Sequence, residues 1–325
     1  MKRVVVTDAT FPDLAREEEA ARAAGAEFRR ADCRTAEEVA EAVRGADVAV
    51  VQFAPLTRAA IAALRPGATA IRYGVGYNNF DLRALDEHGV RAAYVPDYCT
   101  AEVADHTAAA VLALLRRLFP LDRSVRAGEW KAVAVARPLP AFTATTVGFL
   151  GFGRIAQEVA RRLAPFGFRL IAHDPLFRPA AGGPAVEPVS FADLLAQSDA
   201  LSLHAPATAD TVGIIGAAAL ARMKPGAMIV NSARGDLIDE AALATALNEG
   251  RIGGAALDVF VSEPLPAGSP LRSAPNTILT PHAAWYSEVA VARLQGLVAE
   301  EITRALTGQP VRCAIPGTIA ARTDR

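Results

Sequence analysis

The sequence predicts an α/β protein with two doubly wound parallel-sheet domains. Short apolar runs alternate with helical runs along most of the 325 residues, which is typical of parallel sheets that carry helices on both faces. The apolar runs are almost continuous, as expected for strands that are buried on two sides. A long helical stretch separates a shorter βα series from a longer one, so we expect two domains.

Four strands are expected in the first series, with helical segments between them. The apolar runs are KRVVVTD, ADVAVVQF, ATAIRYG and VRAAYVP. The segments between these runs, such as DLAREEEAARAAG and TAEEVAEAVRG, are interpreted as helices. This series is the smaller of the two.

The second series follows a long helical stretch. That stretch begins near Glu102, and we expect Pro120 to end it, because proline lacks the backbone donor that a helix interior needs. Six strands are then expected, in the runs TTVGFL, FRLIAHD, DALSLH, GAMIVN, GGAALD and NTILT. A last helix should start at Ser287 as its N-cap and stop at Gly308. The tail after this glycine is expected to be irregular.

Composition excludes several classes of partner. The formal net charge is −1, so neither nucleic acid nor an anionic membrane is an expected partner. No apolar run reaches the roughly 20 residues of a membrane span, and the N-terminus is interpreted as a strand and not as a signal peptide. Three cysteines stand far apart, which favours free thiols in the cytoplasm. No histidine or cysteine pair has metal-ligand spacing, so no metal is expected.

A glycine-rich turn predicts a dinucleotide site. Gly151 and Gly153, with Ala156 in the third position, follow an apolar strand and open a helix. Gly151 would permit the tight turn and Gly153 the approach of a pyrophosphate to the helix N-terminus. Asp174 stands at the end of the next strand, where a carboxylate binds the ribose hydroxyls and favours NAD over NADP. Arg178 lies close by and leaves NADP open.

Ionisable side chains follow the strands of the second series. Ligands of open α/β sheets bind at the carboxyl ends of the strands, so a cation, a proton donor and an acid gathered there favour hydride-transfer chemistry. The residues at these positions are His204, Arg234, Asp258, Glu263 and His282.

Less specific interpretations stand beside this one. His204 could pack near the cofactor, Arg234 could belong to a surface loop, and Asp258 could cap a turn. The remaining histidines are interpreted as helix-end, packing or rim residues: His88, His106 and His173.

Over nearly its whole length, the chain resembles the D-isomer-specific 2-hydroxyacid dehydrogenases. The segments that carry the resemblance are RYGVGYNNFDLRAL, VPDYCTAEVADHT, VRAGEW, VGFLGFGRIAQ, MKPGAMIVNSARGDLIDEAAL, GRIGGAALDVFVSEP and NTILTPHAAWYSE. Within the family the chain looks closest to the C-terminal-binding-protein branch, on GGAALDVFVSEP and PHAAWYSE.

The resemblance implies the fold of each domain. Residues 1–100 and 288–325 would form a flavodoxin-like domain that binds the substrate. Residues 101–287 would form a Rossmann-like domain that binds NAD, with the active site in the cleft between the two domains. Two departures from the family are Asn79, where aspartate is usual, and the Pro-rich segment 137–146, whose role the sequence does not indicate.

The resemblance also implies residue roles. Arg234 would hold the substrate carboxylate, His282 would give a proton to the keto oxygen, and Glu263 would hydrogen-bond His282 and keep it protonated. Cofactor contacts are expected at Thr107, Gly151, Gly153, Arg154, Ile155, Asp174, His204, Ala205, Pro206, Ser232, Ala233, Arg234, Asp258 and His282, with Asp258 on the nicotinamide carboxamide. Substrate contacts are expected at Val75, Gly76, Arg234, His282 and Trp285. Trp285 could instead be a packing residue.

The implied activity is NAD-dependent reduction of a 2-keto acid to the D-2-hydroxy acid by a homodimer. One alternative is an NAD(H)-sensing regulatory protein of the C-terminal-binding-protein type that reads short peptides. Another is a specialised relative that acts on phosphoglycerate, glyoxylate, hydroxypyruvate or phosphite.

Overall fold

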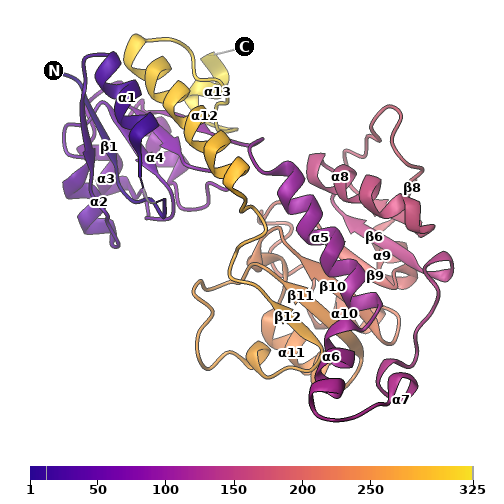
Figure 1. Cartoon of the computed structure of the whole chain (residues 1–325). Coiled ribbons are helices and arrows are strands. Elements are labelled where there is room, and N and C mark those ends of the chain that lie inside the picture. The colour runs from indigo at the N-terminus through magenta and orange to yellow at the C-terminus, as the bar shows by residue number, and fades with distance from the viewer. Residues whose placement is uncertain (12, 324–325) are drawn as a thin grey trace. The chain divides into compact units, whose positions relative to one another are not determined.

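The computed structural model describes residues 1–11 and 13–323. Residues 12, 324 and 325 lie outside the described residues, and the last two end the expected range 288–325. The chain divides into two compact units, one of Met1–Cys99 with Ser287–Arg325 and the other of Thr100–Tyr286 (Figure 1). Both units are built on parallel sheets, as the alternating pattern predicts.

The first unit holds a five-stranded sheet in the order β2-β1-β3-β4-β5. Its strands are β1 (Arg3–Val6), β2 (Glu27–Arg30), β3 (Val48–Val51), β4 (Thr69–Arg72) and β5 (Arg91–Tyr94). Its first helices are α1 (Ala15–Ala23), α2 (Ala36–Ala42), α3 (Arg58–Ala63) and α4 (Leu82–Glu87). Four strands match the apolar runs. The fifth, β2, was missed because its sequence EFRR is mostly exposed at the sheet edge and has no apolar run.

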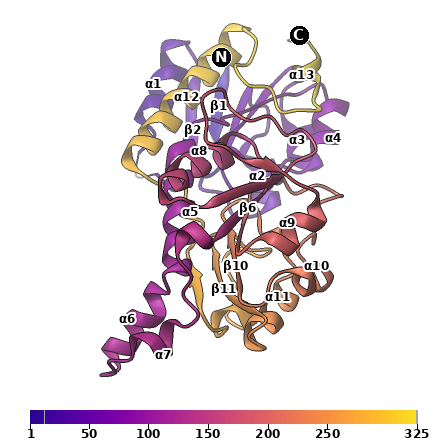
Figure 2. The ribbon, with the colours of Figure 1, turned by 90° about the vertical axis from the view of Figure 1, so that its right-hand side faces the viewer.

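The chain returns to this unit through α12 (Glu288–Thr307), followed by α13 (Ile319–Thr323). The Ser287 hydroxyl accepts the Ala290 N–H at the start of α12, and Gly308 ends the helix at φ 74°, so both expected helix ends are confirmed. Helix α12 packs against α1 (Figures 1 and 2). The tail is more ordered than expected. The buried Glu301 accepts hydrogen bonds from the N–H groups of Arg312 and Cys313. The next residue, Ala314, pairs with Ala93 of β5.

The second unit holds a seven-stranded parallel sheet in the order β12-β11-β10-β9-β6-β7-β8. Its strands are β6 (Thr146–Leu150), β7 (Arg169–His173), β8 (Glu187–Pro188), β9 (Ala200–Leu203), β10 (Ala227–Asn231), β11 (Ile252–Leu257) and β12 (Thr277–Leu279). The strand order reverses between β6 and β9, which is where ligands bind in such sheets. The six expected strands are present, and the two-residue β8 at the edge was too short to predict.

Helices cover both faces of this sheet. On one face, α5 (Thr100–Leu115) and α8 (Arg154–Leu163) pack over one apolar cluster. On the other face, α9 (Phe191–Gln197), α10 (Ala217–Arg222) and α11 (Glu240–Asn248) pack over a second cluster. Four short 3₁₀ helices complete the unit: η1 (Phe142–Ala144), η2 (Ala164–Phe166), η3 (Gly235–Leu237) and η4 (Pro270–Arg272).

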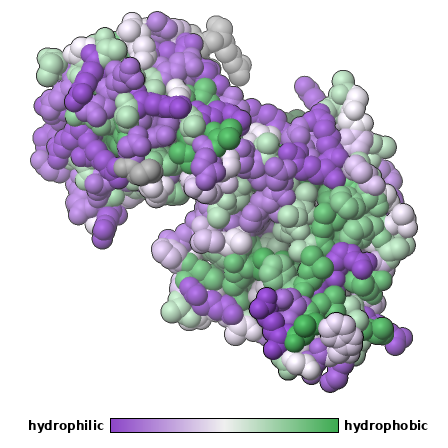
Figure 3. Space-filling view, viewed as in Figure 1, coloured by the Kyte–Doolittle hydropathy of each residue, from purple (hydrophilic) through white to green (hydrophobic). Residues whose placement is uncertain are grey.

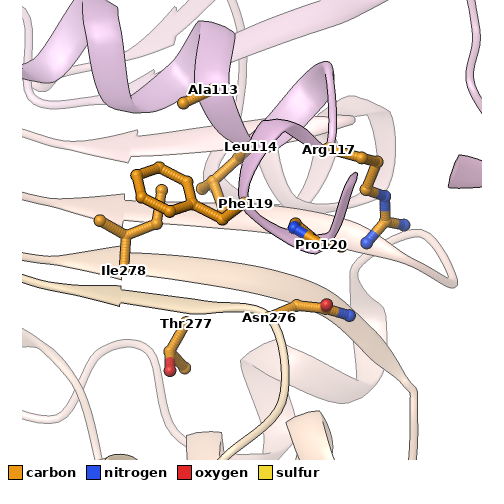
Figure 4. A pocket seen from close by; sticks show the side chains of 8 residues that line it. All are labelled: Ala113, Leu114, Arg117, Phe119, Pro120, Asn276, Thr277 and Ile278. Carbon is orange, nitrogen blue, oxygen red and sulfur yellow. The ribbon is translucent and has the colours of Figure 1, made fainter. Parts of the chain in front are cut away.

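The end of α5 differs from the expectation. Helix α5 stops before Pro120, because Arg117 adopts a left-handed conformation at φ 55° and its guanidinium donates to the Gly253 oxygen at 2.8 Å. Pro120 lies in the first turn of α6 (Leu118–Arg126), where a missing N–H breaks no helical hydrogen bond. The corner leaves a small pocket, in which Phe119 lies beside Ile278 (Figure 4).

Helices α6 and α7 (Ala132–Ala136) form an arm, residues 118–136, that extends away from the sheet of the second unit (Figure 2). Helix α6 buries no residue and α7 buries only Ala136. Large apolar side chains are exposed along the arm, at Leu118, Phe119, Val125, Trp130 and Val133. Apolar residues also gather on the face of this unit over α5, β12 and α6 (Figure 3).

The first unit contains a buried acid next to the loop that follows β4. Glu17 on α1 is fully buried, and the hydroxyl of Tyr73 donates to its Oε1. Within the described residues, Oε2 of Glu17 has no hydrogen-bond partner. Burial raises the pKa of Glu17 more than the hydrogen bond from Tyr73 lowers it, so the folded unit favours the protonated acid.

Replacing Glu17 by glutamine should therefore stabilise the protein near neutral pH. A carboxyl group whose pKa is raised on folding contributes stability below its ordinary value of 4.5, and this contribution is lost as the pH rises through the folded pKa. We expect Glu17→Gln to raise the melting temperature at pH 7 by a few degrees, about 1 kcal/mol, and to raise it less at pH 4. Glu19→Gln, on the exposed side of α1, is the control. Equal gains at both pH values would contradict the prediction.

Candidate active site

The turn between β6 and α8 fits a dinucleotide phosphate. Gly151 has φ 85°, and a Cβ there would lie 2.9 Å from the backbone of His204 and Ala205, so only glycine allows the two loops to touch. Gly153 caps α8 with open space around it, and no side chain caps this helix N-terminus. The first N–H groups of α8, at Arg154 and Ile155, therefore lie at an open helix end that suits an anion.

Asp174 is fixed at the end of β7. Its two carboxylate oxygens accept the backbone N–H groups of Phe152 and Leu176, each at 2.7 Å. The acid is thus tied directly to the glycine turn, as a ribose-binding carboxylate needs to be. The open helix end and the fixed acid fit NAD.

His204 follows β9 and packs next to the same turn. Burial lowers the pKa of His204 to about 3, so the ring is neutral at physiological pH. Its Nε2 lies 2.8 Å from the hydroxyl of Ser202, and its ring lies near Phe149. The next two residues carry the chain away from β9. Ala205 is buried, and the Pro206 oxygen accepts the hydroxyl of Thr211. These contacts hold a neutral His204 against the turn, and its contact with the cofactor stays a prediction.

Side-chain hydrogen bonds hold the loop after β10 in place. The hydroxyls of Thr107 on α5 and Ser232 lie 2.6 Å apart, so the structure joins two expected cofactor residues. Asn231 is almost fully buried, accepts the Ala233 N–H at 3.0 Å and donates to the Arg234 oxygen at 2.8 Å. Sequence reasoning missed Asn231, although a polar residue that ends the apolar run AMIV was a usable signal.

Glu263 and His282 form a close pair. The His282 Nδ1 lies 2.7 Å from Oε2 of Glu263, and the Phe260 N–H donates to Oε1 of the same acid at 3.0 Å. Burial alone would raise the pKa of Glu263. The hydrogen bonds from His282 and Phe260, with the positive charges of His282 and Arg234, lower it below its ordinary value. Glu263 is therefore an anion that accepts a hydrogen bond from the Nδ1–H group of His282.

A second glycine brings Arg234 to this pair. A Cβ on Gly235 would lie 2.0 Å from the carbonyl carbon of Phe260, so the backbone of the Arg234 loop presses directly on the backbone of the Glu263 loop. Only glycine permits this approach. Sequence reasoning did not identify Gly235, because a close approach between two loops leaves no mark in a local pattern.

Asp258 has other partners than the nicotinamide contact expected for it. The residue is 2% exposed. Oδ1 accepts the Thr280 hydroxyl at 2.5 Å and the Ala283 N–H at 2.8 Å, and Oδ2 accepts the Ala284 N–H at 2.9 Å. The carboxylate therefore binds the turn that carries His282. Its contact with the cofactor stays a prediction.

The expected substrate residues fall in both units. Trp285 belongs to the second unit, and its ring meets the edge of Tyr286 at 5.7 Å between centroids. Val75 and Gly76 belong to the first unit, in the loop after β4, where Arg72 donates to the Gly76 oxygen. Their contact with a substrate stays a prediction.

The side chains at this edge of the second sheet suit proton and hydride chemistry on an anionic substrate. A histidine held by an anionic carboxylate can exchange a proton, and a nearby guanidinium can bind a carboxylate. Among the described residues, no three histidine, cysteine or acidic side chains are grouped so as to hold a metal ion. In the same part of the chain, no helix has the length and apolar character needed to span a membrane.

Comparison with known proteins identifies relatives of this site. The model of the NAD-binding domain of the D-isomer specific 2-hydroxyacid dehydrogenases matches residues 108–284, more than half of the chain. D-3-phosphoglycerate dehydrogenase of Mycobacterium leprae is 40% identical over 276 residues, which are 84% of this chain and 52% of that protein. The chain spans about half the length of the curated relatives it matches.

Solved structures share the fold along almost the entire chain. NAD-dependent formate dehydrogenase from Staphylococcus aureus, in complex with NAD, superposes with a TM-score of 0.86 at 29% identity over 98% of this chain and all of that chain. A glyoxylate reductase from Paecilomyes thermophila superposes with a TM-score of 0.84 at 29% identity over 97% and 98% of the two chains. The chain therefore belongs to the D-isomer specific 2-hydroxyacid dehydrogenase family, and its second unit contains the family's NAD-binding domain.

Proposed function

We propose that the protein is an NAD-dependent oxidoreductase that reduces a 2-keto acid to the D-2-hydroxy acid. The observation that carries the proposal is the 2.7 Å contact between His282 and the anionic Glu263, with the charge of Arg234 acting on the same acid. These side chains stand on the second unit, which also holds the glycine turn.

Each side chain has a distinct task in this proposal. Arg234 binds the substrate carboxylate and polarises the keto group through its positive charge. Glu263 accepts a hydrogen bond from the Nδ1–H group of His282 and thereby fixes the orientation of the ring. The proton for the keto oxygen then comes from Nε2. Gly235 keeps the Arg234 loop against the Glu263 loop.

The cofactor would bind along the β6–α8 turn. The N–H groups of Arg154 and Ile155 would face its phosphates, and Asp174 would hold a ribose. Thr107 is fully buried and would act through Ser232, whose hydroxyl lies 2.6 Å from its own. When bound, NADH supplies the hydride for the carbonyl carbon. Asp174 is partly exposed and tied to Phe152, and its negative charge disfavours the 2′-phosphate of NADP.

The identity of the substrate is a separate proposal. The 40% identity to D-3-phosphoglycerate dehydrogenases favours a phosphorylated 2-hydroxy acid as the second candidate. A regulatory role of the C-terminal-binding-protein type rests only on the segments GGAALDVFVSEP and PHAAWYSE, and the relatives described above are dehydrogenases and a reductase.

A panel of keto acids tests the activity. NADH oxidation should be followed with pyruvate, hydroxypyruvate, glyoxylate, phosphohydroxypyruvate and keto acids with apolar side chains. Turnover of any of these supports the proposal, and the preferred one identifies the substrate class. Tight NADH binding without turnover of any keto acid would contradict it, and saturable binding of short apolar peptides would then favour the regulatory role.

We further infer that the protein is a cytoplasmic homodimer. The three cysteines stand far apart in the sequence, which fits a reducing compartment. The arm, residues 118–136, exposes large apolar side chains and buries only Ala136. A helical pair without a core of its own needs a partner surface, and a second copy of this chain is the partner we propose.

Replacing His282 by alanine should abolish reduction while NADH still binds. Loss of a general acid lowers kcat by about 10²–10⁴-fold, whereas the glycine turn and Asp174 are unchanged. The measurements are kcat with the preferred keto acid and NADH affinity by fluorescence. His88→Ala, at the end of α4 in the first unit, is the control. Activity that survives in His282→Ala would remove the proton-donor assignment.

Replacing Trp285 by alanine should change substrate preference more than NADH affinity. An indole face packs well against methylene and sulfur groups, so kcat/KM should fall about tenfold for a keto acid with a large apolar side chain and much less for glyoxylate. Tyr286→Ala, which removes the neighbouring exposed ring, is the control. Equal losses for small and large keto acids would make Trp285 a packing residue.

A charge on the arm should weaken the dimer. Val133 is 74% exposed in the chain, and burying an unpaired carboxylate at an interface is costly. We expect Val133→Asp to raise the dimer dissociation constant at least about 100-fold, measured by sedimentation velocity. Val212→Asp, at another exposed valine of this unit, should not change it. A monomeric wild-type protein would rule out the homodimer.

A further inference from the structure

The backbone of His282 is strained. Its φ is 52°, in the left-handed region that residues other than glycine rarely adopt. Its N–H donates to the backbone oxygens of Asp258 at 2.8 Å and Thr280 at 3.1 Å. Such a conformation persists only where the surrounding structure fixes it, so the contacts around this turn determine where the imidazole lies.

The Asp258 carboxylate holds the turn on both sides of His282. It binds the hydroxyl of Thr280, two residues before, and the N–H groups of Ala283 and Ala284, the next two residues. Because the carboxylate is almost fully buried, these three donors do not compete with bulk water for it. The Asp258 carboxylate therefore joins the residues before and after His282 through hydrogen bonds.

Helix α5 contributes a third member to this network. The His106 Nε2 lies 3.3 Å from the Thr280 hydroxyl and 3.9 Å from Oδ1 of Asp258. Thr280 has a single hydroxyl proton, which it donates to Asp258, so its oxygen accepts from His106. The order of donation is His106 to Thr280 to Asp258, and it ties the turn to a helix that packs on the sheet.

We propose that Asp258, Thr280 and His106 are positioning residues for His282. They hold residue 282 in its left-handed conformation, and so they place its ring against Glu263. This inference rests on the proposed role of His282 as proton donor. The network acts on the backbone of His282, while Glu263 acts on its Nδ1, and the two constraints together orient Nε2.

The test removes the Thr280 hydroxyl without changing charge or shape. In Thr280→Val we expect kcat to fall about 10- to 100-fold, since small displacements of a catalytic group have effects of this size. KM for the keto acid and the NADH dissociation constant should stay within about twofold. Thr280→Ser keeps the hydroxyl and should recover most of the activity. His106→Leu should lower kcat and His106→Gln, which keeps an N–H donor, should lower it less.

A second readout does not depend on turnover. Ring ¹⁵N–¹H spectra of histidine-labelled protein report the hydrogen bond between His282 and Glu263, and the chain has only 5 histidines to assign. The His282 signal should move in Thr280→Val. It should not move in Thr245→Val, which removes a hydroxyl bonded to the Ala241 oxygen on α11.

Two results would overturn the inference. One is an unchanged His282 signal in Thr280→Val, together with unchanged kcat where the wild type is active. The other is weakened NADH binding with unchanged kcat, which would make the Asp258 network a cofactor site. A wild-type protein without turnover would count against the proposed function, and the His282 signal would still decide whether the network positions this residue.

Discussion

The candidate site depends on direct contact between backbones of loops that leave neighbouring parallel strands. Gly151 lies against His204 and Ala205, and Gly235 lies against Phe260. A single methyl group at either position would overlap main-chain atoms, which cannot move aside as a side chain can. The first contact fixes the cofactor turn against the His204 loop, and the second fixes the Arg234 loop against the Glu263 loop. The polar side chains of the site are therefore positioned by the backbone of the loops that carry them.

Charge at the site is balanced over short distances. Glu263 is anionic because His282 and Arg234 offset its burial, and Asp258 is buried among three hydrogen-bond donors. The two acids act on different parts of the same histidine, one on the ring and one on the turn. His204 stays neutral because burial lowers its pKa.

Much of this arrangement follows from local sequence pattern. Continuous apolar runs predicted ten strands, the caps Ser287 and Gly308 predicted both ends of α12, and the glycine turn predicted the place of Asp174. The pattern did not reveal strands that bury no apolar face, which are the exposed β2 and the two-residue β8. It also failed at the end of α5, which is set by a contact between residues far apart in the sequence. The Arg117 guanidinium donates to the Gly253 oxygen, and the helix ends before Pro120.

The same limit applies to the site. Arg234, Glu263 and His282 could be named because their residue types stand out after apolar strands. Gly235 and Thr280 could not, because each acts through contacts that depend on the folded loops. Asn231 ends an apolar run and could have been singled out, but its two hydrogen bonds within the loop appear only in the fold. The Asp258 side chain was recognised, but its partners come from residues 280–284, and sequence spacing does not show them.

The first unit is assembled from both ends of the chain, since α12 packs against α1 and the tail pairs with β5. During synthesis, the continuous segment Thr100–Tyr286 leaves the ribosome complete while the first unit still lacks its last helix. At about 5–20 residues per second, the N-terminal strands wait roughly 10 to 40 seconds for that helix. The part of the chain that is made first is thus the part that finishes folding last.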